Sequence, residues 1–213
     1  MPDVEDASLE VLHDHHKDSF TYIREREKQR DRLFLILIGL FALLSVEILY
    51  PTHFGGALGA WRITGAEVDL GALPLPALLS ASWVFTFAIA LRYCQVSINV
   101  ERQYSYLHML EEKISQNLGD PDVYRRESKA YLADYPLFSD WAWICYVFVF
   151  PVIAALATMA LIIAEWSRLQ VPWPYNLLNS LLAAALVLSL FLYRIFPSLS
   201  RKLCSSREKS GAR

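Results

Sequence analysis

The sequence predicts an all-α integral membrane protein with four transmembrane helices and a cytosolic helical hairpin extending from helices 2 and 3. The first observation is a set of four apolar runs, Leu33–Tyr50, Leu73–Leu91, Ala142–Ala164 and Leu177–Phe196. A hydrocarbon core of about 30 Å needs roughly 20 apolar residues in a helix, and each run has about that length. The second observation is that the segments between the runs hold nearly all of the charge.

Basic residues predict the orientation of these helices. Eighteen of the 20 Lys and Arg residues lie before the first run, between the second and third, or at and beyond the end of the fourth. The two other connections hold only Arg62 and Arg168. The positive-inside rule then places both termini in the cytoplasm, so we expect a multi-pass protein of a plasma membrane.

The bulk composition excludes a strongly basic nucleic-acid-binding protein, because the formal net charge is −2. Residues 1–32 precede the first run without an obvious small-residue cleavage site, so this run is interpreted as a retained span. Cys94, Cys145 and Cys204 fall on or near the predicted cytoplasmic side, where thiols stay reduced, so no disulfide framework is expected.

The N-terminal segment, residues 1–32, is predicted to form an amphipathic and then charged helix. Apolar side chains recur with helical spacing at Leu9, Leu12, His16, Phe20 and Ile23. The following stretch, Arg24–Arg32, has no apolar side chain and can run straight into the first span. It serves either as a juxtamembrane helix that meets anionic lipid or as a docking surface for a cytosolic partner protein.

The first transmembrane hairpin covers residues 33–91. A short outer segment follows Pro51, and Trp61–Leu70 alternates loosely, which predicts a small hairpin on the outer surface. The polar side chains expected to face the interior of the spans are Glu47 in this hairpin and Asn179 and Ser180 in the last span. Because burial against lipid would be unfavourable, we expect these three to face an axis shared between subunits. The alternative for Glu47, which lies about one turn before Pro51, is that its side chain reaches the outer interface.

The cytosolic helical hairpin covers residues 92–140. Span two is expected to continue as one helix from about Pro76 to Leu118, because no Pro or Gly interrupts Arg92–Leu118 and Gly119 supplies a C-terminal cap. A second helix, about Pro121–Asp134, would return to the membrane. The projecting helix carries an apolar stripe, Val100, Tyr104, Leu107, Ile114 and Leu118.

This stripe needs a cover, which is the returning helix, the N-terminal helix or a second copy of the chain. We expect it to mediate self-association into a homo-oligomer. Arg125, Arg126 and Lys129 on the returning helix form a basic patch for an anionic ligand or for anionic lipid.

The second transmembrane hairpin covers residues 141–196, and a basic cytosolic tail covers 197–213. Pro151 inside span three removes one backbone hydrogen bond and predicts a kink that serves packing or gating. The tail from Arg201 to Arg213 is rich in Ser, Lys and Arg, which predicts disorder.

No motif in the chain indicates an enzyme or a cofactor. His13, Asp14, His15 and His16 are the only cluster of metal-capable side chains, and two His at helical spacing in an acidic segment do not make a metal site. We find no P-loop, dinucleotide-binding or zinc-protease motif, and the Ser, His and Asp spacing suggests no nucleophile elbow. Non-enzymatic function without a cofactor or metal is therefore expected.

Four short spans with a cytosolic helical extension and no catalytic domain resemble the small membrane proteins of bacterial antiviral defence loci. The segment Tyr104–Trp143, with Leu-Glu-Glu-Lys-Ile and later Tyr-Pro-Leu-Phe-Ser-Asp-Trp, also resembles a segment of bacterial membrane proteins. The families with this layout are effectors paired with retrons or nucleotide signalling, SLATT-type effectors and the membrane subunit of the Kiwa system. The resemblance implies a location in the bacterial inner membrane and a role as a pore-forming or membrane-disrupting effector triggered by a cytosolic signal. The alternative is a membrane sensor or anchor for a cytosolic protein.

Overall fold

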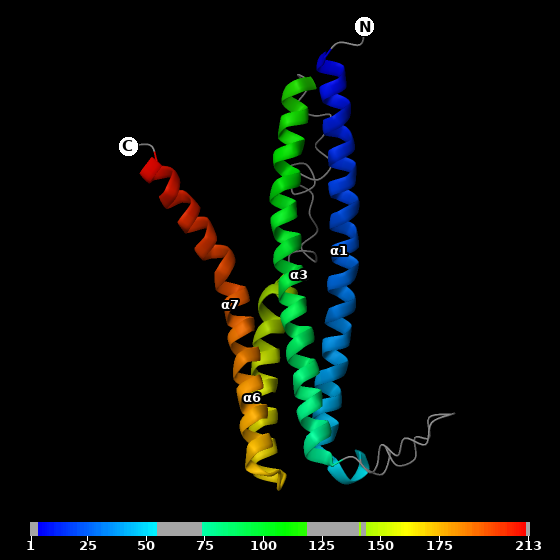
Figure 1. Cartoon of the computed structure of the whole chain (residues 1–213), viewed down its shortest axis with the longest axis vertical. Coiled ribbons are helices and arrows are strands. Elements are labelled where there is room, and N and C mark those ends of the chain that lie inside the picture. Colours follow the sequence, from blue (N-terminus) through cyan, green and yellow to red (C-terminus); the bar gives the residue numbers. More distant parts are fainter. Residues whose placement is uncertain (1–3, 55–73, 119–140, 142–143, 212–213) are drawn as a thin grey trace, which may run out of the picture. The chain divides into compact units, whose positions relative to one another are not determined.

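The computed structural model describes residues 4–54, 74–118, 141 and 144–211, and all regular elements within them are helices. They are α1 (Val4–Leu49), α3 (Leu75–Leu118), the short π-helix η2 (Cys145–Val149), α6 (Phe150–Arg168) and α7 (Trp173–Gly211) (Figure 1). Four of these helices are long and apolar enough to cross a membrane. The prediction of an all-helical chain with four candidate spans is therefore confirmed.

Two long helices continue well beyond their apolar segments, as the sequence predicts. Helix α1 runs without a break from the charged N-terminal segment into the first apolar run. Helix α3 likewise includes both the second apolar run and the projecting stripe, and it ends at Leu118 before Gly119. The returning helix, the basic patch Arg125, Arg126 and Lys129, and the outer hairpin Trp61–Leu70 lie outside the described residues.

The second pair of spans has different boundaries from those predicted. Helix α6 continues past Ala164 to Arg168, and α7 begins at Trp173 rather than at Leu177. Helix α7 also continues through the tail to Gly211, so the prediction of disorder from Arg201 is wrong. Arg, Lys and Glu are good helix formers, and no Gly occurs between Leu177 and Gly211, so the polar tail extends the helix.

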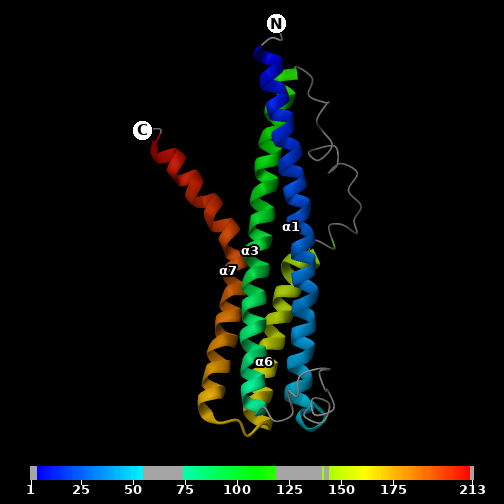
Figure 2. The same cartoon turned by 45° about the vertical axis from the view of Figure 1, so that its right-hand side comes forward.

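The chain forms two compact units, which are described separately. The first combines Met1–Arg32 with Gln95–Tyr146, and the second combines Leu33–Cys94 with Val147–Arg213. In the first unit, α1 and α3 lie side by side and run in opposite directions (Figures 1 and 2). Two polar contacts between them are the 2.9 Å hydrogen bond from the Tyr104 hydroxyl to Glu27 and the 3.3 Å contact between His16 and Glu111.

Buried residues follow an alternating three- and four-residue spacing on the helices, the heptad pattern of packed helix pairs. On α3 this buried face is Leu79, Trp83, Thr86, Ala90, Tyr93, Ser97, Val100, Leu107, Glu111 and Ile114, with half-buried Tyr104 in the same phase. On α6 it is Pro151, Ala154, Thr158, Leu161 and Glu165. On α7 it is Asn176, Asn179, Ala183, Leu186, Leu190 and Tyr193.

The second unit is a bundle of four helices around one core. Leu44 and Ile48 of α1 pack with residues of the other three helices, namely Leu79, Trp83, Leu161 and Ala183. Towards the start of α6, three aromatic rings meet: the ring centroids of Phe34 and Phe150 are 4.6 Å apart, and those of Tyr93 and Phe150 are 5.8 Å apart. Apolar side chains from all four helices therefore form a core in this bundle.

Candidate functional site

Each helix of the second unit contributes a polar side chain to the bundle interior near the same end. Glu47 lies in the last turn of α1 and Glu165 in the last turn of α6. Asn179 lies in the second turn of α7, and Ser82 and Trp83 lie about two turns into α3. All five residues are buried, and we call them the polar layer.

Hydrogen bonds connect the polar layer across the helices. The Ser82 hydroxyl donates to Glu47 Oε1 at 2.9 Å. Glu165 accepts two bonds, from Trp83 Nε1 to its Oε2 at 3.0 Å and from Asn179 Nδ2 to its Oε1 at 2.7 Å. Because neighbouring residues of α3 donate to carboxyl groups of α1 and α6, the layer fixes how these three helices pack.

Neither carboxyl group forms an ion pair with a basic side chain among the described residues. Glu47 is 2% exposed and Glu165 is fully buried. A charged side chain inside a membrane costs about 3 kcal/mol or more, and such side chains usually mark ion paths or proton relays. The polar layer is therefore the candidate functional site.

The sequence predicted part of this layer and missed the rest. Glu47 and Asn179 were expected to face the interior, and the structure places both inside a single chain rather than at a surface open to a second copy. Glu165 and Trp83 were missed. Glu165 was assigned to the outer loop because the apolar run ends at Ala164, yet it continues the buried spacing of Ala154, Thr158 and Leu161.

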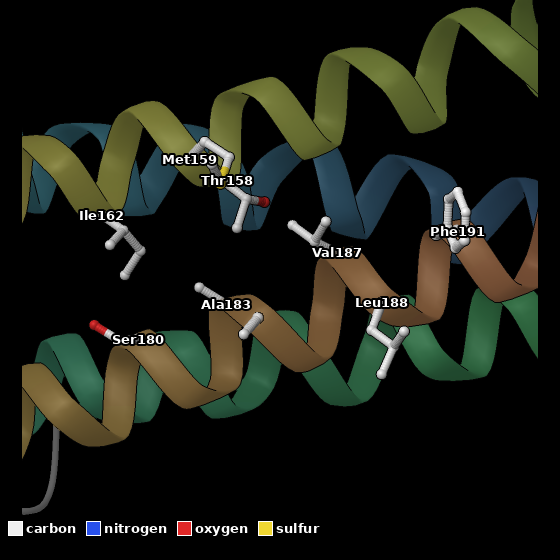
Figure 3. Close-up of a pocket in the computed structure, with 9 residues that line it drawn as sticks. Thr158, Met159, Ile162, Ser180, Ala183, Val187, Leu188 and Phe191 are labelled. Carbon is white, nitrogen blue, oxygen red and sulfur yellow. The ribbon is translucent and has the colours of Figure 1, made fainter.

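Ser180 lies apart from the polar layer. Its Oγ accepts a 3.1 Å bond from the exposed Trp166 ring, and it lines an apolar cavity of about 470 Å³ between α6 and α7. In Figure 3, Thr158 and Ile162 of α6 point towards Ser180 and Val187 of α7 across this cavity. The other lining residues are Met159, Ala183, Ala184, Leu188 and Phe191, so the cavity is almost entirely apolar.

Pro151 lies in the first turn of α6, directly after the π-helix η2. Because the residues before α6 are already helical, a regular α-helix would pair the amide of residue 151 with the carbonyl of Val147, and a proline cannot donate that bond. Helix α6 begins with Phe150 and Pro151 directly after η2, and the kink predicted at Pro151 stays a prediction. π-Helical segments such as η2 are common points of bending in membrane helices.

The apolar stripe of α3 is packed largely within the chain. Val100, Leu107 and Ile114 are buried, Tyr104 bonds to Glu27 of α1, and Leu118 is 41% exposed. The N-terminal helix thus provides at least part of the cover that the stripe needs. These buried residues do not offer a free surface for the predicted homo-oligomer, which stays a prediction.

The histidines near the N-terminus do not form a metal site in the described part of the chain. No group of three His, Cys, Asp or Glu side chains is suitably arranged there to hold a metal ion. His16 instead contacts the buried Glu111, and the His15 ring lies edge-on to Tyr106 with 6.3 Å between ring centroids.

Comparisons with protein-family models, curated proteins and solved structures found no match to this chain.

Proposed function

We propose that this chain is a non-enzymatic membrane protein that conducts ions and lowers the membrane potential when a signal reaches its cytosolic helices. The observation that carries the proposal is the polar layer, because it buries two acidic side chains inside helices apolar enough to span a membrane. Ionisable groups in such positions are costly and mark pathways for ions or protons. The setting in bacterial antiviral defence rests on the resemblance of layout alone.

The pathway would run through the four-helix bundle of one chain. Along α1, the polar layer at Glu47 is thirteen residues from Phe34, roughly 20 Å at the helical rise. Between them the fully buried Leu37 and Leu44 fill the interior, and the rings of Phe34, Tyr93 and Phe150 meet. Because apolar constrictions block ions by excluding water, we interpret the described conformation as closed.

Opening would require the aromatic rings to separate. Phe150 lies between η2 and Pro151, so a change in the π-helical segment would move its ring directly. The helix pair of the first unit belongs to the same continuous helices, α1 and α3, that contribute Phe34 and Tyr93 to the bundle. This continuity supports a role for the cytosolic helices in receiving the signal.

The test is depolarisation of cells that produce the protein, followed with a potential-sensitive dye before and after phage infection. The full chain should depolarise the membrane, and Glu47→Leu should suppress that response by removing an acidic group from the pathway. Val46→Leu is the matched control, since it introduces the same side chain at the neighbouring, 43% exposed position. A response that is unchanged in Glu47→Leu would contradict a pathway through the polar layer.

The second candidate is a membrane anchor or sensor for a cytosolic protein. It is favoured by the charged, exposed side chains on the helix pair, among them Arg24, Glu25, Glu112 and Lys113. If the potential holds under every condition while a soluble protein co-purifies through this pair, the anchor replaces the ion-conducting effector as the function.

A further inference from the structure

We infer that the ion that this chain handles is the proton and that Glu47 is the residue that binds it. The inference rests on the proposed function and specifies the ion class at the polar layer. It starts from a difference between the two buried carboxyl groups, which share one layer but differ in their hydrogen bonds.

Each carboxyl oxygen of Glu165 has a hydrogen-bond donor, whereas only one carboxyl oxygen of Glu47 has one. Both Glu165 oxygens accept a hydrogen bond, from Trp83 and from Asn179. Glu47 accepts only through Oε1, from Ser82, and its Oε2 is buried without a hydrogen-bond partner in the described part of the chain. Glu47 is therefore the carboxyl group with an oxygen available for a ligand.

The number of available oxygens favours a proton over a metal cation. Metal ions such as Ca²⁺ and Mg²⁺ collect about six oxygen ligands, and K⁺ gives up its water only to a comparable set of oxygens. In the polar layer the unpartnered buried oxygens are Glu47 Oε2 and Asn179 Oδ1. Two oxygens are too few for a dehydrated metal ion, and a proton needs one.

The charged groups around Glu47 agree with this assignment. The neighbouring helices contribute Ser82 and Trp83 of α3, Glu165 of α6 and Asn179 of α7 to the polar layer around Glu47. Of these four residues, Glu165 is the ionisable one. The nearest basic or imidazole side chains along the chain, His53 after the end of α1 and Arg168 in the last turn of α6, are exposed. No ion pair joins either of them to Glu47 or Glu165 among the described residues. A proton on Glu47 Oε2 leaves one negative charge in the layer instead of two.

The step is a reversible proton transfer. Hydronium at the end of the bundle nearest the polar layer gives one proton to Glu47 Oε2 and leaves a water molecule, and the carboxylate becomes a neutral carboxyl group. When the bundle opens, the same O–H bond breaks and water accepts the proton on the other side. Glu165 keeps its two hydrogen bonds throughout.

Infrared difference spectroscopy on the purified full-length protein tests the site without requiring conduction. Titration with acid and base should show the C=O band of a buried protonated carboxyl group, and Glu47→Gln should remove it. Glu25→Gln, the same change at an exposed position of the same helix, should leave the band in place. If Glu47→Gln does not fold, Glu47→Asp replaces it and should keep the band at a shifted frequency.

Three outcomes overturn the inference. The band is absent from the unaltered protein, it is unaffected by Glu47→Asp, or it persists in Glu47→Gln and disappears in Glu165→Gln. Ion-flux measurements in proteoliposomes then distinguish a failure of the proton assignment from a failure of the proposed function. With a pH-sensitive dye inside, the protein should acidify the lumen under an inside-negative potential, and Glu47→Gln should abolish the signal. Potassium flux without proton flux refutes the proton assignment alone, and a Glu47 band without any ion flux refutes the conducting function alone.

Discussion

Glu165 and Glu47 differ in how well an amide can replace them. A glutamine has one acceptor oxygen and one amino group, and at position 165 two donors, Trp83 Nε1 and Asn179 Nδ2, point at the side chain. One of those donors must lose its acceptor whichever way the amide lies. At position 47 the amide oxygen can turn to Ser82, while the amino group takes the side without a partner.

We therefore expect Glu165→Gln to lower the free energy of unfolding by about 1–3 kcal/mol, the cost of an unpaired buried donor. Glu47→Gln should cost less than about 1 kcal/mol, near the average for polar contacts in membrane helices. Unfolding of both variants in detergent, followed by circular dichroism, measures the order. Equal losses, or a larger loss for Glu47→Gln, would contradict the hydrogen-bond arrangement of the layer.

For single residues, the sequence predicts burial of polar side chains that interrupt an apolar run and misses burial of those at the edge of a run. Glu47 stands out because it lies among apolar neighbours, and Asn179 does so for the same reason. Glu165 directly follows an apolar run and precedes Trp166 and Arg168, so charge and hydropathy place it outside the predicted span. Only its phase with Ala154, Thr158 and Leu161 indicates burial, because position on a helix face depends on spacing rather than on local composition.

The helix pair of the first unit depends on apolar residues at heptad positions of α3. Leu107→Ala should destabilise this pair by about 2–5 kcal/mol, the usual cost of truncating a fully buried leucine. Leu118→Ala makes the same change at a 41% exposed position of the same helix and should cost less than about 1 kcal/mol. Hydrogen exchange of the α3 amides measures both, and similar exchange in the two variants would mean that the stripe is not packed as described.

The junction of η2 and α6 is the second element with a testable role. Pro151→Ala restores a backbone N–H that can donate to the carbonyl of Val147, so the π-helical turn should convert to regular α-helix. Stability should change by less than about 1 kcal/mol, since proline is well tolerated in a first turn. Depolarisation should weaken if movement of Phe150 opens the bundle. A depolarisation response equal to that of the unaltered chain would remove this junction from the opening movement.

Element boundaries are predictable where a helix-breaking residue marks them. Gly119 predicted the end of α3 at Leu118, and the absence of Pro and Gly from Arg92 to Leu118 predicted that this helix is continuous. The helical tail of α7 was not predicted, because low apolar content suggests disorder although the same residues favour helix once a preceding helix supplies the first turn. For the cover of the stripe, the sequence favoured a second copy of the chain and left the returning and N-terminal helices as alternatives, because packing partners depend on which helices meet in space.

At the scale of the whole molecule, the orientation in the membrane remains a prediction from the distribution of Lys and Arg. In a chain with its native cysteines replaced by alanine, Glu112→Cys and Trp173→Cys would place single thiols at exposed positions of α3 and α7. An impermeant maleimide added to intact cells should label residue 173 and not residue 112. Labelling of 112 alone would invert the topology and move the helix pair to the outer side.

The unbroken heptad spacing on α3, from Leu79 to Ile114, constrains how the length of this chain can change. An insertion of one residue turns everything beyond it by about 100° around the helix axis, which would bring Glu111 out of the buried face and carry exposed neighbours into it. An insertion of seven residues nearly restores the phase. Homologous chains with a longer or shorter helix pair in the first unit should therefore differ from this one by multiples of seven residues, matched in α1 and α3.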